Sequence, residues 1–212
     1  MGLFGGKKDP CPVCGGEVTG LFKTKIKDGA LCRSCADRVA LPKETLKKAD
    51  VPFIKEHLAF RENEAKLFSV MTPTHKFTFG SSFTLTADDT LRMLAIGDTD
   101  FNSSENPIVL RYDEVKTYAL YKGKKKLDDH TMPGSTVSQT MTSVLNTFMH
   151  GKDAPAEDYT IKLTTTHPYW PVMDIFLLDV DHPEFHGYKN NMGSMAHLIK
   201  CIVRKEPFVM EY

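Results

Sequence analysis

The 212-residue sequence predicts an α+β protein made of a small four-cysteine module, a helical linker and a larger antiparallel β domain closed by a C-terminal helix. Three observations predict this order. Two Cys-x2-Cys pairs lie within the first 35 residues, and apolar residues recur at helical spacing from about residue 50 to 67. From about residue 72, apolar and polar residues alternate with a period of two, which is typical of half-buried strands.

The composition is that of an ordinary soluble globular protein, with 41% hydrophobic and 25% charged residues. The longest apolar runs, such as residues 175–178, are too short to span a bilayer, and the N-terminus lacks the apolar core of a secretory signal. We therefore expect a cytoplasmic protein. The formal net charge is zero, but residues 1–50 carry ten basic and six acidic side chains, so the remainder carries an equal negative excess.

The four N-terminal cysteines, Cys11, Cys14, Cys32 and Cys35, have the spacing of metal ligands in a reducing compartment. Four thiolates favour one tetrahedral Zn2+ with a closed shell, which makes the predicted metal structural. An iron site of the rubredoxin type is the alternative. A glycine-bearing knuckle at residues 11–16, a hairpin over 17–31 and a helix over 36–41 predict a treble-clef or ribbon-like module spanning residues 1–42.

The first forty residues resemble a known family. The opening MGLFGGKK (1–8), CPVCG (11–15), KIKDG (25–29) and CRSC (32–35) resemble a bacterial and phage zinc-ribbon family of unknown function. The resemblance implies zinc at the four cysteines and a bacterial or phage source, and it implies no activity.

The predicted linker covers residues 43–71 and contains one long helix. Asp50 is a suitable N-cap, Pro52 fits the first turn, and the helical pattern continues to about Leu67. The apolar stripe fades in the second half of this helix, so we expect one end to pack on its neighbours. We expect His57 at the edge of that packing face.

Residues 72–212 predict about seven short strands, followed by an amphipathic helix from about Tyr188 to Lys205. The stripe of this helix consists of Met192, Met195, Ala196, Ile199, Ile202 and Val203. A helical insertion is expected at about residues 129–153, with an amphipathic helix over 138–150. That helix would cover an open side of the barrel or form a docking surface.

Seven strands followed by one helix resemble the layout of a pleckstrin-homology-like (PH-like) barrel, in which the helix closes one open end. The segment LRYDEV (110–115) is similar to the third-to-fourth strand region of bacterial members of that superfamily. A different β-barrel or sandwich capped by a helix fits the pattern nearly as well.

The best candidate anion-binding group consists of Lys122, Lys124, Lys125 and Lys126. In PH-like lipid binders a basic loop between early strands contacts phosphates, whereas this group follows a later strand. The alternative is a solvated turn.

Two further groups have an ordinary structural alternative. Asp179, Asp181, His182 and His186, with His167, could ligate a second metal, but Asp and His are also common loop residues. Cys201 would need exposure and a neighbouring base to act as a nucleophile, and its alternative is a partly buried position in the C-terminal helix.

No P-loop, dinucleotide fingerprint or nucleophile-elbow motif is present, and no small-molecule substrate is evident. We therefore expect a non-enzymatic adaptor or scaffold that binds other proteins. One alternative is nucleic-acid binding through the basic zinc module. Another is peripheral membrane or phosphoinositide-type binding through the Lys122–Lys126 loop.

Overall fold

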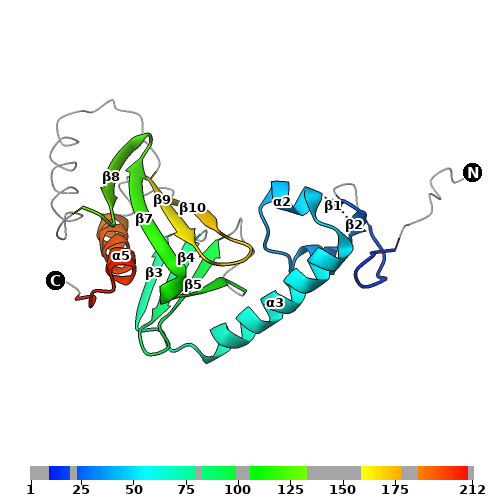
Figure 1. The fold of residues 1–212 in the computed structure, drawn as a ribbon, viewed down its shortest axis with the longest axis horizontal. Coiled ribbons are helices and arrows are strands. Elements are labelled where there is room, and N and C mark those ends of the chain that lie inside the picture. The colour runs from blue at the N-terminus through cyan, green and yellow to red at the C-terminus, as the bar shows by residue number, and fades with distance from the viewer. Residues whose placement is uncertain are drawn as a thin grey trace, which may run out of the picture. The chain divides into compact units, whose positions relative to one another are not determined.

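The computed structural model describes residues 10–19, 23–79, 83–98, 106–132, 159–177 and 186–209 (Figure 1). These residues form two compact units. The first unit contains the described residues up to Val70 together with Gly97–Ile108. The second unit contains Met71–Ile96 and the described residues from Val109 onward.

The first unit begins with an antiparallel hairpin of β1 (Thr24–Ile26) and β2 (Gly29–Leu31). Gly29 has a φ of +150°, and a Cβ there would lie 3.6 Å from the ring of Pro12. Glycine therefore suits this turn, because an L side chain rarely adopts such a backbone conformation. Three helices follow, α1 (Arg33–Ala36), α2 (Lys43–Lys48) and α3 (Val51–Val70).

Helix α3 begins where the sequence predicts. The backbone N–H of Phe53 donates to the Asp50 carboxylate at 3.0 Å, which confirms Asp50 as the N-cap. The helix continues to Val70, three residues beyond the predicted end at Leu67.

The buried face of α3 is more polar than expected. His57 is completely buried rather than at the edge of the packing face. Arg61 and Glu64, also buried, form an ion pair with 2.6 Å between Nη1 and Oε2. Arg61 also donates to the backbone carbonyl of Asn106, which ties α3 to the Gly97–Ile108 segment of the same unit.

The described residues form two four-stranded sheets, which belong to the second unit except for the end of β5 and the first residue of β6. The first has the order β3-β4-β5-β6, with strands β3 (His75–Phe79), β4 (Phe83–Asp88), β5 (Met93–Asp98) and β6 (Ile108–Arg111). A 3-10 turn, η2 (Tyr112–Glu114), leads into the second sheet, which has the order β10-β9-β7-β8. Its strands are β7 (Val115–Lys122), β8 (Lys125–Asp129), β9 (Tyr159–Thr165) and β10 (Val172–Leu177).

Strand periodicity explains most of these elements. In β9, Tyr159, Ile161, Leu163 and Thr165 are buried, and the residues between them are not. Strand β8 was missed by the sequence prediction of about seven strands. It pairs with β7, which also pairs with β9, so β7 lies between two strands that both follow it in the chain.

The C-terminal helix α5 (His186–Arg204) packs against β3, β7 and η2. The predicted stripe is confirmed, since all of its members except Val203 are buried. The helix ends in a Schellman motif, in which the N–H of Glu206 donates to the carbonyl of Cys201 at 2.9 Å and Lys205 takes a φ of +59°.

The predicted α+β fold is therefore confirmed, with a four-cysteine cluster, a long helix, antiparallel sheets and a packed C-terminal helix. The expected helix over 138–150, and nearly all of the insertion containing it, lie outside the described residues. None of the described helices combines the length and apolarity needed to cross a membrane.

Candidate metal centre

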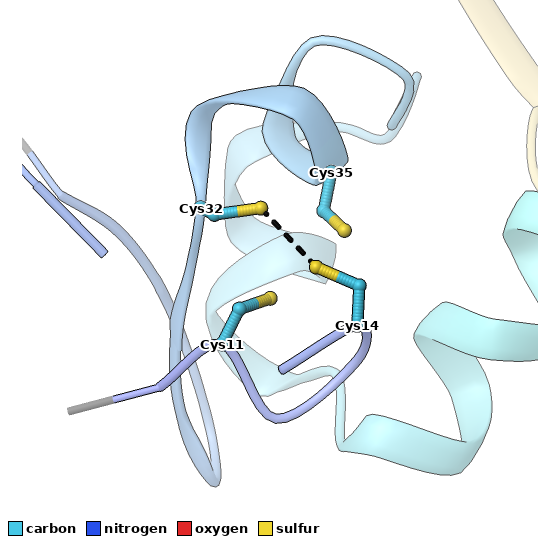
Figure 2. A group of neighbouring side chains, drawn as sticks. All are labelled: Cys11, Cys14, Cys32 and Cys35. Atoms are coloured by element: carbon cyan, nitrogen blue, oxygen red, sulfur yellow. Dashed lines mark hydrogen bonds between the residues drawn. The ribbon is translucent and has the colours of Figure 1, made fainter. Parts of the chain in front are cut away.

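The first two cysteines lie on a tight knuckle. The N–H of Cys11 donates to the carbonyl of Gly16 at 2.7 Å, and the N–H of Gly15 donates to the carbonyl of Cys11 at 2.8 Å. Gly15 has a φ of +76°, a left-handed conformation that glycine adopts without steric cost. The knuckle therefore turns Cys11 and Cys14 toward the same point (Figure 2).

The second pair lies where β2 passes into α1. Cys32 is the N-cap of α1, and Cys35 lies on its first turn, with the N–H of Ala36 donating to the Cys32 carbonyl at 2.9 Å. The predicted helix over 36–41 instead occupies Arg33–Ala36, because it starts directly at the cysteine pair. This turn directs Cys32 and Cys35 at the knuckle (Figure 2).

The four sulfurs fit a tetrahedral ion. All four Sγ atoms lie within 4.8 Å of one another, and those of Cys14 and Cys32 are 3.5 Å apart. Four sulfurs that each lie about 2.3 Å from zinc would be about 3.8 Å apart. Cys11, Cys32 and Cys35 are buried and Cys14 is exposed, so the centre lies at the edge of its unit.

Protonation differs between the thiols when no cation is bound. Burial raises the pKa of Cys11, but hydrogen bonds from the backbone N–H groups of Cys32, Cys14 and Val13 outweigh it and lower the pKa to about 6. Burial, followed by hydrogen bonds to the other thiols, raises the pKa of Cys35 well above its ordinary value. A bound divalent cation would favour the thiolate form of all four, since the metal replaces the protons.

Because Gly16 has no side chain, it leaves room for the cysteine sulfurs beside it. Its N–H approaches the Cys14 Sγ at 3.4 Å, and a Cβ at Gly16 would lie 3.3 Å from the same sulfur. A side chain here would therefore displace a ligand, or the knuckle would have to shift. The paired glycines after Cys14 are the sequence signal for this feature.

Helix α3 supports the cysteine module through His57. Its Nε2 accepts a hydrogen bond from the backbone N–H of Ala40 at 3.1 Å, which fixes the chain just beyond α1. Because Nε2 is the acceptor, the neutral tautomer carries its proton on Nδ1. The buried apolar residues of this unit include Leu31, Val39, Ala40, Leu41, Ile54 and Leu58.

The four lysines of the predicted anion-binding group lie in different environments. Lys122 is buried, with its ammonium 5.1 Å from the ring centroid of Tyr159. Lys126 pairs with Asp129 at 3.1 Å, and this contact raises the pKa of Lys126. Lys124 and Lys125 are exposed at the β7–β8 turn, where anion binding stays a prediction.

The predicted second metal group is only partly described. Asp179, Asp181 and His182 lie outside the described residues, as does the side chain of His186. His167 is buried, and its Nδ1 accepts from the backbone N–H groups of Tyr169 and Trp170, each at 3.2 Å. His167 therefore orders the β9–β10 turn.

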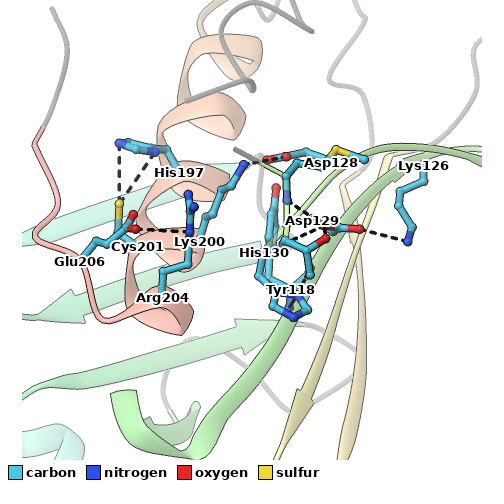
Figure 3. Close-up of polar contacts among 12 residues, drawn as sticks. Tyr118, Lys126, Asp128, Asp129, His130, His197, Lys200, Cys201, Arg204 and Glu206 are labelled. Carbon is cyan, nitrogen blue, oxygen red and sulfur yellow. Dashed lines mark hydrogen bonds and ion pairs between the residues drawn. The ribbon is translucent and has the colours of Figure 1, made fainter. Parts of the chain in front are cut away.

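Cys201 does not have the geometry of an activated nucleophile. Its Sγ lies 3.8 Å from Nδ1 and 3.7 Å from Nε2 of His197, so it is not directed at either nitrogen (Figure 3). Burial, followed by the charge of Glu206, raises the pKa of the Cys201 thiol. Both features favour the neutral thiol.

Sequence reasoning missed a buried ion pair between α5 and β8. Lys200 Nζ lies 2.8 Å from Asp128 Oδ1, and each side chain is 1% exposed (Figure 3). The partners are 72 residues apart, so no local pattern links them. The buried Tyr118 lies in the field of Asp128, and burial, followed by that charge, raises the pKa of its hydroxyl well above its ordinary value.

Comparison with known families assigns only the cysteine module. Residues 10–57 match the domain of unknown function DUF4428. The DUF4428 match contains all four cysteines, α1, α2 and the first part of α3, and its description carries no activity. Searches of curated proteins and of solved structures found no match to the chain. The PH-like fold and the bacterial source stay predictions.

Proposed function

We propose that this protein is a non-enzymatic adaptor that binds an extended segment of another protein along β10. The observation that carries this proposal is the exposed apolar face of that strand. Val172 is 60% exposed and Phe176 is 52% exposed, whereas Met173, Ile175 and Leu177 on the opposite face are buried. Exposed apolar residues on a sheet edge favour pairing with another chain.

The position of β10 supports strand addition. It is an end strand of the order β10-β9-β7-β8, and among the described strands only β9 pairs with it. Between the two apolar residues, Asp174 pairs with Lys162 at 3.1 Å, so the middle of this face carries a balanced pair rather than a repulsive charge. A partner segment with apolar residues at alternate positions would add backbone hydrogen bonds and cover Val172 and Phe176.

In this proposal the four cysteines hold one structural Zn2+. Four thiolates fill a tetrahedral shell and leave no position for water or substrate, so the metal would stabilise the module rather than catalyse a reaction. A reducing cytoplasm, in which thiols persist, suits such a site. A bacterial source is part of the same proposal, and it rests on the N-terminal resemblance.

A PH-like fold for the second unit is also proposed. A PH-like layout has seven strands and a closing helix. Here the first sheet, β3-β4-β5-β6, supplies four strands. Strands β7, β9 and β10 supply the other three, and α5 supplies the helix. Strand β8 departs from that layout, because it extends the second sheet beyond β7. Fold alone does not fix function, so the binding proposal rests on β10.

The test is recovery of a partner by the tagged, zinc-loaded full chain from nuclease-treated native lysate. The Val172→Lys/Phe176→Lys variant places charge on the edge, and Val209→Lys is the matched control at a 66% exposed position. We expect one stoichiometric protein with the wild-type chain and the control, and at least about tenfold less with the double variant. Equal recovery by the double variant, or no stoichiometric protein, would contradict the proposal.

Nucleic-acid binding is the second candidate, because three lysines form an exposed row on the zinc module. Lys23, Lys25 and Lys27 are exposed at alternate positions along and beside β1, so their side chains share one face. Partners that disappear after nuclease treatment, together with binding that weakens steeply with salt, would favour this candidate. Membrane binding through Lys124 and Lys125 would instead give flotation with anionic liposomes.

A further inference from the structure

A cavity of about 430 Å³ lies in the second unit beside the C-terminal end of α5. The turn between β4 and β5 contributes Asp89 and Arg92 to its lining, and η2 contributes Tyr112. The remaining lining comes from the last turns of α5 and the segment that follows it. Its volume is within the range of small-molecule sites.

One side of the cavity is apolar. Leu198 and Ile202 line it from the buried face of α5, and Phe208 lines it from the segment after the helix. The Phe208 ring lies 4.8 Å from the His75 ring and 5.4 Å from the His197 ring, measured between centroids. These contacts fix Phe208, so the apolar side is preformed.

The acidic residues that line the cavity already have partners. Asp89 accepts from the Tyr112 hydroxyl at 2.7 Å and contacts Nε2 of His75 at 2.9 Å. Burial raises the pKa of Asp89, but these two hydrogen bonds outweigh it and lower the pKa below its ordinary value. Glu206 lies 3.4 Å from Arg204 (Figure 3).

The basic residues that line the cavity have no acidic partner among the described residues. Neither Arg92 nor Lys205 forms an ion pair with any residue that the structure describes. The Arg92 guanidinium lies 5.3 Å from the Tyr112 ring centroid, an arrangement that leaves its N–H donors available. Two cations with available N–H donors therefore line the cavity.

The backbone conformation of Arg92 and Lys205 is an independent observation that points to a ligand at this cavity. Arg92 has a φ of +54° and Lys205 a φ of +59°, and they are the two non-glycine residues with positive φ in the described part of the chain. Glycine is the usual residue at both kinds of position, a tight turn and the end of a Schellman motif. A long side chain is sterically strained in this conformation, and such outliers cluster at ligand sites.

We propose that this cavity binds a small organic carboxylate with an apolar body. Arg92 and Lys205 bind the carboxylate through charge-assisted hydrogen bonds. The apolar body packs against Leu198, Ile202 and Phe208. This site is independent of the protein-binding proposal, because β10 contributes no residue to the cavity.

The test measures octanoate binding to the full chain by calorimetry, with 1-octanol and acetate as comparison probes. 1-Octanol keeps the apolar body without the charge, and acetate keeps the charge without the body. The key variant is Arg92→Gly/Lys205→Gly. The charge-matched control is Lys76→Gln/Lys116→Gln, which changes two exposed lysines of the same unit outside the cavity lining.

We expect saturable octanoate binding with Kd below about 1 mM, and at least about tenfold weaker binding of 1-octanol and of acetate. The glycine variant should lose octanoate binding at least about tenfold while its Tm is unchanged or higher, because glycine relieves the strained backbone. A purely structural role for the two residues would change Tm without changing octanoate binding. Undetectable octanoate binding, equal binding of either comparison probe, or equal loss in the control variant would overturn the proposal.

Discussion

The two units of this chain reach a folded state by different means. The first has strands of three residues and a four-residue α1, and four cysteines converge at its edge. Among its described residues, the second has longer strands and a 19-residue helix, and both bury many apolar side chains. Small modules with little core depend on metal ligation, whereas larger domains depend on apolar burial. Each unit should therefore respond to a different perturbation.

The largest expected effect is loss of metal from the first unit. The variant Cys32→Ser, or removal of metal by a chelator, should unfold the zinc module while the second unit stays folded, because structural zinc contributes about 10 kcal/mol or more to such modules. Metal analysis and residue-resolved NMR would measure both outcomes. Cys201→Ser is the matched control, since this buried cysteine lies outside the cluster. If the first unit kept its structure without metal, the inference that only this unit depends on metal would be wrong.

The next largest effect lies in the second unit. Lys200→Met leaves the Asp128 carboxylate buried beside a side chain that cannot pair with it, so we expect a loss of about 3–5 kcal/mol in the free energy of unfolding. Denaturant unfolding would measure this loss, and zinc content should not change. Lys200→Met/Asp128→Leu should recover much of the loss because both charges of the pair are then removed. If the double variant were as unstable as the sum of both changes, the pair would not act as a unit.

Acid should destabilise the second unit through Asp88. Its carboxylate accepts from the backbone N–H of Leu91 at 2.8 Å and of Thr72 at 2.7 Å, and these hydrogen bonds, led by Leu91, lower its pKa. A lowered folded pKa stabilises the fold above the unfolded value of about 3.9, and this contribution is lost as the pH falls through the folded pKa. Asp88→Asn should cost about 1–2 kcal/mol at neutral pH and give a shallower loss of stability in acid. Parallel pH profiles for variant and wild type would contradict this assignment.

The smallest expected effect concerns the start of α3 in the first unit. Asp50→Ala removes the N-cap of α3 and should destabilise that helix by about 1 kcal/mol. Hydrogen exchange of the first-turn amides in the zinc-loaded protein would measure it. Glu56→Ala removes an exposed carboxylate from the same helix without removing a cap. Equal effects of the two changes would mean that charge, rather than capping, stabilises the helix start.

The sequence predicted elements whose cause is local. The cysteine spacing located the four-cysteine cluster, Asp50 located the start of α3, and the apolar stripe located α5. Strand β8 was missed because Lys125, Lys126 and Asp128 make it look like a polar turn. Asp128 is instead buried by its pair with Lys200, 72 residues away. The cavity was missed for the same reason, since only the fold brings Arg92 and Lys205 to one cavity lining.

The first unit is discontinuous in sequence, and this affects the order in which a nascent chain can complete it. Its early part ends at Val70, but Gly97–Ile108 is made only after two strands and part of a third belonging to the second unit. Until Asn106 leaves the ribosome, the buried Arg61 lacks the carbonyl that accepts its second hydrogen bond. All four cysteines are synthesised early, but Arg61 of α3 gains this hydrogen bond only after synthesis of the neighbouring unit has begun.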